Sequence, residues 1–157
     1  MKFSQILVLA AATLGAAACG GGSSTGGLDA EAVYTFALTQ AAAVPAPKPT
    51  TASGSAQMIL YPGSIDYQVN GTSIIGVTAA HIHNGAPGVQ GPIVVTLLSQ
   101  TAGGTVNGVL AKGTLTAANL PSGVTLDALK ALILSGNAYI NVHTTANPSG
   151  EIRGQIK

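Results

Sequence analysis

The sequence AYINVHTTANPSGEIRGQIK, residues 138–157, is a β-hairpin pattern that organises the rest of the chain. Two strand-like runs, Ala138–Thr144 and Glu151–Lys157, flank the turn residues Asn147-Pro148-Ser149-Gly150. Side chains alternate between the two faces of a strand. If the loop has an odd number of residues, as in a three-residue turn with left-handed Gly150 and a bulge, the apolar residues share the core face. That face then carries Ile140, Val142, Ile152 and Ile156, and the opposite face carries Tyr139, Asn141, His143, Glu151, Arg153 and Gln155.

Similar strand-like runs recur upstream, separated by turn residues such as Pro62-Gly63, Asn70-Gly71 and Gly103-Gly104. A proline-rich connection, Val44 to Pro49, follows the first run and is unsuited to a central strand. The regular alternation of strand-like runs and turn residues predicts antiparallel β structure. The runs are Ala32–Leu38, Ser55–Tyr61, Ile65–Val69, Thr78–His83, Ile93–Leu98 and Val109–Thr116.

One helix is predicted near residues 125–135. Thr125 is a good N-cap residue, Leu126, Leu129 and Ile133 form an apolar stripe, and Gly136 suits the left-handed stop. Lys130 in its second half complements the helix dipole. The fold class is therefore all-β, an antiparallel β-sandwich with one short α-helix that covers one end of a sheet.

The N-terminal segment predicts export and lipid attachment. Residues 1–18 have a basic Lys2, a short apolar stretch and small residues before Cys19, the chain's one cysteine. The apolar stretch is too short to span a bilayer. We expect a lipoprotein signal peptide over 1–18, a lipidated Cys19 with a Gly/Ser tether over 19–28, and a single domain over 29–157. Ala16 stands where such signals usually have leucine.

The charge of the chain excludes several partners. Loss of Lys2 with the signal leaves five basic and five acidic residues. Nucleic acid requires clustered Lys and Arg, so no nucleic-acid partner is expected. The acidic residues are dispersed, and the sequence has neither a nucleophile elbow nor a phosphate-binding loop. We therefore expect no enzymatic activity and no cofactor.

All three histidines lie in two short motifs, His81-Ile82-His83 and Asn141-Val142-His143. His81 and His83 project from the same strand face, about 6.6–6.8 Å apart at the backbone. With His143 from a neighbouring strand they would form a three-nitrogen site for zinc or copper, with nitrogen separations of roughly 3–4 Å. The alternative is that the three histidines are buried and hydrogen-bond the loops that surround them.

A second group of polar residues, Asn141, Glu151 and Arg153, lies in the hairpin. One interpretation is an ion pair between Glu151 and Arg153, with or without His143, that fixes the hairpin. The other is a polar patch that faces a ligand. The glycines Gly85, Gly88 and Gly91 predict a tight, rigid loop after the first histidine motif.

Three blocks of the chain resemble the CHRD domain, a module that is repeated in chordin and occurs singly in many bacterial secreted proteins. They are AHIHNGAPGVQGPIV (80–94), GNAYINVHT (136–144) and NPSGEIRGQ (147–155). The resemblance covers about Ala32 to Lys157. It implies an extracytoplasmic β-sandwich-like module that is not established as an enzyme, and the growth-factor partner of chordin is not carried over.

The chain is also similar in two features to copper-zinc superoxide dismutase, namely the His-x-His strand and the late motif Gly150-Glu151-Ile152-Arg153-Gly154. The sandwich is thus expected to be an immunoglobulin-like or superoxide-dismutase-like Greek key. That enzyme family needs further histidines and a disulfide, whereas this chain has three histidines and one cysteine. Redox catalysis is therefore not expected.

The function expected from the sequence is a lipid-anchored binding or interaction module outside the cytoplasm. Its partners would be the membrane, through the lipid, and a protein or matrix component. The cell envelope is the expected location, on the outer membrane or cell surface where the source has two membranes. The alternative function is copper or zinc binding through His81, His83 and His143.

Overall fold

The computed structural model of the chain describes residues 29–100 and 103–157. The predicted signal peptide, the tether and Cys19 lie outside these residues. No helix in the described part of the chain is long and apolar enough to cross a membrane.

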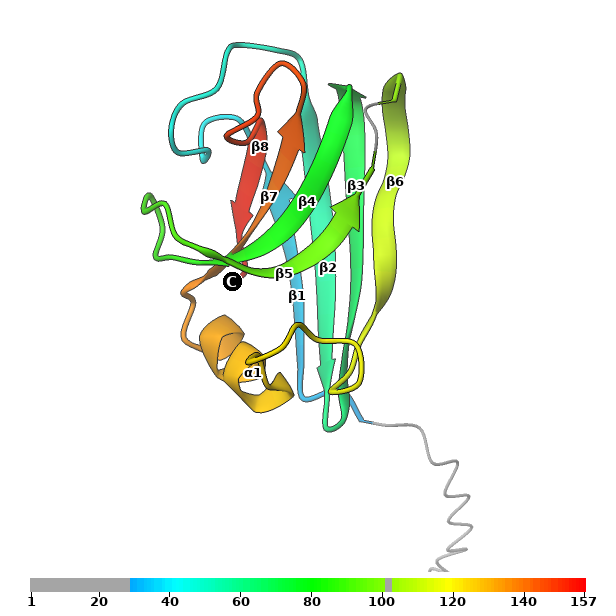
Figure 1. Cartoon of the computed structure of the whole chain (residues 1–157), viewed down its shortest axis with the longest axis vertical. Coiled ribbons are helices and arrows are strands. Elements are labelled where there is room, and N and C mark those ends of the chain that lie inside the picture. Colours follow the sequence, from blue (N-terminus) through cyan, green and yellow to red (C-terminus); the bar gives the residue numbers. More distant parts are fainter. Residues whose placement is uncertain (1–28, 101–102) are drawn as a thin grey trace, which may run out of the picture.

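Two four-stranded antiparallel sheets face each other in the described residues, which confirms the predicted sandwich (Figure 1). The first has the strand order β1-β2-β3-β6 and the second β5-β4-β7-β8. Strand β6 returns beside β3 after β4 and β5 have paired in the other sheet, which is a Greek-key connection. The elements are β1 (Ala32–Leu38), β2 (Ser53–Tyr61), β3 (Ser64–Ile75), β4 (Val77–Asn84), β5 (Ile93–Ser99), β6 (Thr105–Leu115), α1 (Leu126–Leu134), β7 (Ala138–Thr144) and β8 (Ile152–Gln155).

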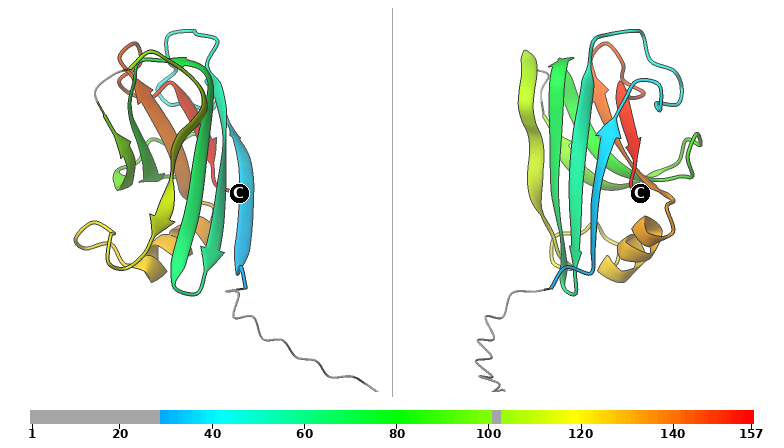
Figure 2. Two further views of the ribbon diagram at one scale, coloured as in Figure 1. Left: turned by 90° about the vertical axis from the view of Figure 1, so that its right-hand side faces the viewer. Right: turned by 180° about the vertical axis from the view of Figure 1, so that it is seen from behind.

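The hydrophobic core fills the space between the two sheets. Figure 2 shows these sheets as two layers. Met58 and Leu60 from the first sheet and Ile82 and Ile140 from the second are essentially inaccessible to solvent. Burial of one such side chain contributes about 1.5–3 kcal/mol. Because alternate residues of each strand face this core, the residues between them face outward.

Helix α1 covers one end of the sandwich, as predicted (Figure 1). The Thr125 hydroxyl accepts a hydrogen bond from Ala128 N at 3.2 Å, and Gly136 has a φ of +71° at the C-terminal end. The proposed role of Lys130 at the helix dipole was wrong. Its buried ammonium instead donates to the carbonyl oxygens of Tyr61 and Pro62 and pairs with Glu31 at 2.7 Å. Lys130 therefore fastens the helix to the β2–β3 turn.

The predicted register of the C-terminal hairpin is confirmed. Val142 pairs with Ile152 and Asn141 with Arg153, so the apolar residues share the core face. The odd-numbered loop is also confirmed, since residues 143–151 separate the pair Val142 and Ile152. The short three-residue turn was wrong, because residues 145–151 lie between the end of β7 at Thr144 and the start of β8 at Ile152. Gly150 has a φ of +120°, which is in the left-handed region, as predicted.

The predicted turn at Asn70-Gly71 was also wrong. Strand β3 continues through both residues to Ile75, with irregular pairing to β6 at this point. A Cβ on Gly71 would lie 2.7 Å from Ile74 Cγ2 and 2.8 Å from Leu110 Cδ1. The glycine thus allows close packing of these two side chains inside a strand, and the chain reverses at Gly76, whose φ is +67°.

Candidate metal centre

Three histidines lie together on the outer face of the β5-β4-β7-β8 sheet. His81 and His83 come from β4 and His143 from β7. Their neighbours Ala80, Ile82 and Val142 are fully buried in the core, so the pleat directs the histidines to the other face. His143 lies opposite Ala79 in the ladder, and this small residue leaves room for the imidazoles beside it.

The three rings are close enough to share one ion. Their centroids are 4.9 Å (His81–His143), 5.7 Å (His81–His83) and 5.9 Å (His83–His143) apart. One ring nitrogen from each lies within 4.8 Å of one from the other two. An ion with bonds of about 2.0–2.1 Å would hold its nitrogens about 3.3 Å apart in tetrahedral geometry. The nitrogen separations, at up to 4.8 Å, are therefore wider than the predicted 3–4 Å.

Two of the rings are oriented by backbone carbonyl groups. His83 Nδ1 lies 2.9 Å from Gly91 O, and His143 Nδ1 lies 2.9 Å from Pro148 O. A carbonyl oxygen only accepts hydrogen bonds, so each Nδ1 carries the proton and each Nε2 is left with a lone pair. Protein metal sites commonly orient a ligating imidazole through its second nitrogen in this way.

Three other ring nitrogens of the cluster are buried and have no hydrogen-bond partner among the described residues. They are His81 Nδ1, His83 Nε2 and His143 Nε2. Buried polar atoms are nearly always hydrogen-bonded, so three exceptions in one cluster need a physical explanation. The structural alternative for the histidines therefore accounts for one nitrogen of His83 and of His143 and leaves the others unexplained.

Burial keeps the imidazoles of β4 neutral. It lowers the pKa of His81 to about 4, with further lowering from His143 and His83. The pKa of His83 is also lowered, mainly by burial, although the bond to Gly91 opposes the shift. A neutral imidazole is the form that binds a metal ion. Protons therefore compete weakly for these two nitrogens near neutral pH.

The β4–β5 loop, residues 85–92, is held over His83 by hydrogen bonds to its backbone. The Arg153 guanidinium donates to Ala86 O and Val89 O, each at 2.9 Å, and Gly91 N donates to the Tyr139 hydroxyl at 3.1 Å. A Cβ on Gly91 would lie 1.6 Å from Asn84 O, so only glycine fits there. The prediction of a tight, glycine-dependent loop is confirmed.

The predicted ion pair between Glu151 and Arg153 was wrong. The Glu151 carboxylate accepts hydrogen bonds from Thr50 Oγ1 and Thr144 Oγ1, both at 2.5 Å, whereas Arg153 binds the β4–β5 loop. Strand β8 begins only at Ile152, so ladder alternation does not direct the Glu151 side chain. Asn141 donates to Ser149 O at 3.2 Å. Asn141, Glu151 and Arg153 are thus buried and fix three different loops, and they do not form one exposed patch.

Sequence reasoning assigned no role to Tyr139 or to the carbonyl groups of Gly91 and Pro148. Tyr139 pairs with His83 across β4 and β7, and its ring stacks on the imidazole. The predicted face already placed Tyr139 beside the histidines, so this contact had a sequence signal. The carbonyl partners depend on how two loops fold back, and the residue types carry no signal for that.

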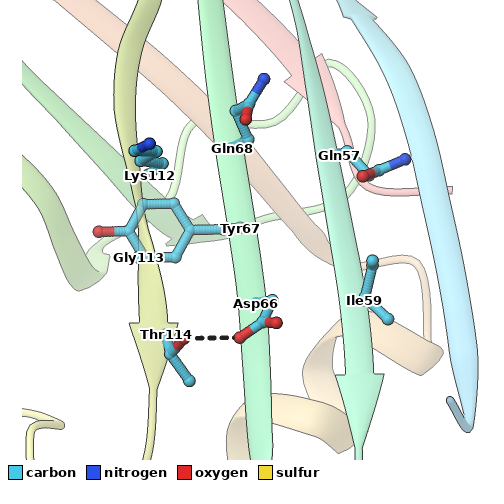
Figure 3. A pocket seen from close by; sticks show the side chains of 8 residues that line it. All are labelled: Gln57, Ile59, Asp66, Tyr67, Gln68, Lys112, Gly113 and Thr114. Atoms are coloured by element: carbon cyan, nitrogen blue, oxygen red, sulfur yellow. Dashed lines mark hydrogen bonds between the residues drawn. The ribbon is translucent and has the colours of Figure 1, made fainter. Parts of the chain in front are cut away.

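A shallow hollow on the outer face of the other sheet is a second candidate site (Figure 3). It lies beside Gly113, where a Cβ would come within 3.0 Å of the Tyr67 hydroxyl. Its acidic residue, Asp66, already accepts a hydrogen bond from Thr114 at 2.6 Å. The unpartnered buried atoms of the described residues lie in the other sheet, so this hollow offers less to an ion than the histidine cluster does.

Comparison with known families matches residues 34–156 to the model of the CHRD domain. No curated protein and no solved structure matches the chain. The matched range contains the three histidines and both loops that orient them. The chain therefore belongs to the CHRD domain family.

Proposed function

We propose that this CHRD-domain protein is a non-catalytic binding module outside the cytoplasm, and that its ligand is one zinc or copper ion held by His81, His83 and His143. Family membership supports a binding module of extracellular type. The observation that carries the metal assignment is the set of three buried ring nitrogens without partners.

A bound cation would remove the cost of these lone pairs. A buried polar atom without a hydrogen-bond partner lowers the stability of the fold by about 1–3 kcal/mol. An apolar residue in place of a histidine would not carry this penalty. A metal bond satisfies each nitrogen at once. The hydrogen bonds from Nδ1 of His83 and His143 leave the two Nε2 atoms free for an ion.

The donor set favours zinc or copper over magnesium or calcium. Imidazole nitrogen suits zinc and copper, whereas magnesium and calcium take oxygen ligands. The possible metal ligands that gather in the described residues are the three histidines, without a carboxylate among them, and Glu151 is engaged by Thr50 and Thr144. Both features support a site that holds an ion and does not turn over a substrate.

Attachment to a membrane through Cys19 completes the proposal. The support is the signal-like segment 1–18, the single cysteine and the glycine-rich residues that follow it. The tether would hold the domain close to the membrane surface. The Cys19→Ala protein should lose palmitate labelling and move from the membrane to the soluble fraction. An unacylated N-terminus beginning at Met1 on soluble cytoplasmic protein would contradict the anchoring.

The metal proposal is tested by dialysis and elemental analysis. Protein loaded with Zn²⁺ or Cu²⁺ and dialysed against metal-free buffer should retain one ion per chain. The His83→Ala variant should retain none, and the Gln68→Ala variant, changed at an exposed position of the other sheet, should behave as wild type. Wild-type protein that retains no ion, with a melting temperature unaffected by added metal, would overturn the proposal.

A further inference from the structure

Four buried side-chain atoms in the described residues have no hydrogen-bond partner, and the fourth is Asn141 Oδ1. The other three are the ring nitrogens of the proposed centre. Such atoms are rare in folded proteins. Their occurrence on one sheet face indicates a shared partner that accepts electron pairs from oxygen as well as nitrogen.

The sheet register places Asn141 next to two of the histidines. Asn141 lies directly opposite His81 in the β4–β7 ladder and two residues before His143 on the same face. Directly opposed residues have Cβ atoms about 4.5–5.5 Å apart, and same-face neighbours on one strand about 6.6–6.8 Å. Asn141 is also 4 % exposed, so bulk water does not serve its carbonyl oxygen.

The orientation of the Asn141 amide is fixed. Its Nδ2 donates to Ser149 O at 3.2 Å, which identifies the other atom as the oxygen. The amide also packs on Gly150, where a Cβ would lie 2.3 Å from both Oδ1 and Nδ2. The same loop thus orients two neighbours, since Pro148 O accepts from His143 and Ser149 O from Asn141.

From this geometry we infer that Asn141 Oδ1 is the fourth ligand of the ion. The inference rests on the proposed metal-binding function. It gives a donor set of three imidazole nitrogens and one amide oxygen. Metal centres with four protein ligands are closed and structural, whereas catalytic centres keep one position for water or substrate. A closed centre agrees with the non-catalytic role proposed above.

Paired substitutions at Asn141 test the inference. Asn141→Leu removes the oxygen, and Asn141→Asp keeps an oxygen but removes the donor to Ser149 O. If Oδ1 is a ligand, Zn²⁺ affinity measured by calorimetry should fall at least tenfold in the leucine variant and be restored in the aspartate variant. If the bond to Ser149 is what matters, both variants should lose affinity alike.

The response of the metal spectrum to azide distinguishes a ligand role of Asn141 from a purely structural role. With Co²⁺ as the spectroscopic probe, the wild-type spectrum should not respond to azide, because the coordination is closed. The leucine variant should gain an azide-dependent change. Circular dichroism is the control that tests whether both variants are folded.

The two proposals fail in different ways. Wild-type affinity and an azide-insensitive spectrum in Asn141→Leu, with metal still lost in His83→Ala, would overturn the ligand role of Asn141 alone. An azide response in wild type equal to that of the variant would do the same. Absence of Zn²⁺ binding by wild type would overturn the metal proposal itself.

Discussion

The rings of Tyr139 and His83 are stacked, with centroids 4.8 Å apart and planes inclined by 8°. The Arg153 guanidinium also packs on Tyr139, with its carbon 3.5 Å from the ring centroid. A cation and an aromatic face attract by about 0.5–2 kcal/mol. This stack connects β8, β7 and β4 and fixes the plane of one proposed ligand.

Two substitutions of Tyr139 should distinguish the effect of the ring stack from the effect of the hydrogen bond. Tyr139→Phe keeps the ring and loses the bond from Gly91 N, so we expect a loss of about 1 kcal/mol in the free energy of unfolding with Zn²⁺ affinity retained. Tyr139→Leu also loses the stack and should weaken Zn²⁺ binding severalfold. Urea denaturation and calorimetry measure the two effects. Equal Zn²⁺ affinity in both variants would show that the stack does not orient His83.

Gly91 should be intolerant of any side chain. Gly91→Ala places Cβ 1.6 Å from Asn84 O and displaces the carbonyl that orients His83. We expect a loss of at least 3 kcal/mol in stability, or a rearranged loop with Zn²⁺ affinity lowered about tenfold or more. Gly63→Ala is the matched control, because a Cβ there meets nothing within 4 Å. A Gly91→Ala protein with wild-type stability and Zn²⁺ affinity would refute the tight packing of this loop.

The stability of the metal-free protein should depend on pH through His81. Its folded pKa is about 4, below the ordinary value of 6.5, so the unfolded chain binds a proton that the folded chain excludes. The free energy of unfolding should therefore fall as pH drops from about 6.5 to about 4, and His81 should add no further loss below that. His81→Gln should show a shallower slope in chemical denaturation with chelator present. Identical slopes would mean that His81 titrates normally in the folded protein.

Lys130 should be needed for stability and not for the metal centre. Lys130→Met leaves the carbonyl oxygens of Tyr61 and Pro62 without their buried donor, at a cost of about 1–3 kcal/mol. Lys112→Met, at an exposed position of β6, should change stability by less than about 0.5 kcal/mol. Thermal denaturation measures both, and Zn²⁺ affinity should be unchanged in each. Equal melting temperatures for the two variants would contradict the anchoring of α1.

Local signals were sufficient to predict most of the fold. Alternation and turn residues predict β1 and β7 with the bounds that the structure has, and the N-cap and stop residues predict α1. The turn expected at Asn70-Gly71 failed because the packing of Gly71 against Leu110 depends on a strand far along the chain. The same two residue types serve a turn in one context and close packing in another.

The candidate site could be predicted in part. Period-two alternation and the hairpin register bring the histidines to one face, which the structure shows. The direction of Glu151 could not be predicted, because its partner Thr50 lies 101 residues away in the sequence. The unpartnered nitrogens could not be predicted either, because they depend on which carbonyl groups the loops present to each ring.

A crystal structure of Zn²⁺-loaded protein, with anomalous data collected at the zinc edge, tests the proposed centre most directly. We predict one anomalous peak about 2.0–2.1 Å from His81 Nδ1, His83 Nε2 and His143 Nε2. Loaded crystals with no peak among these three nitrogens, or with zinc bound only elsewhere, would contradict it.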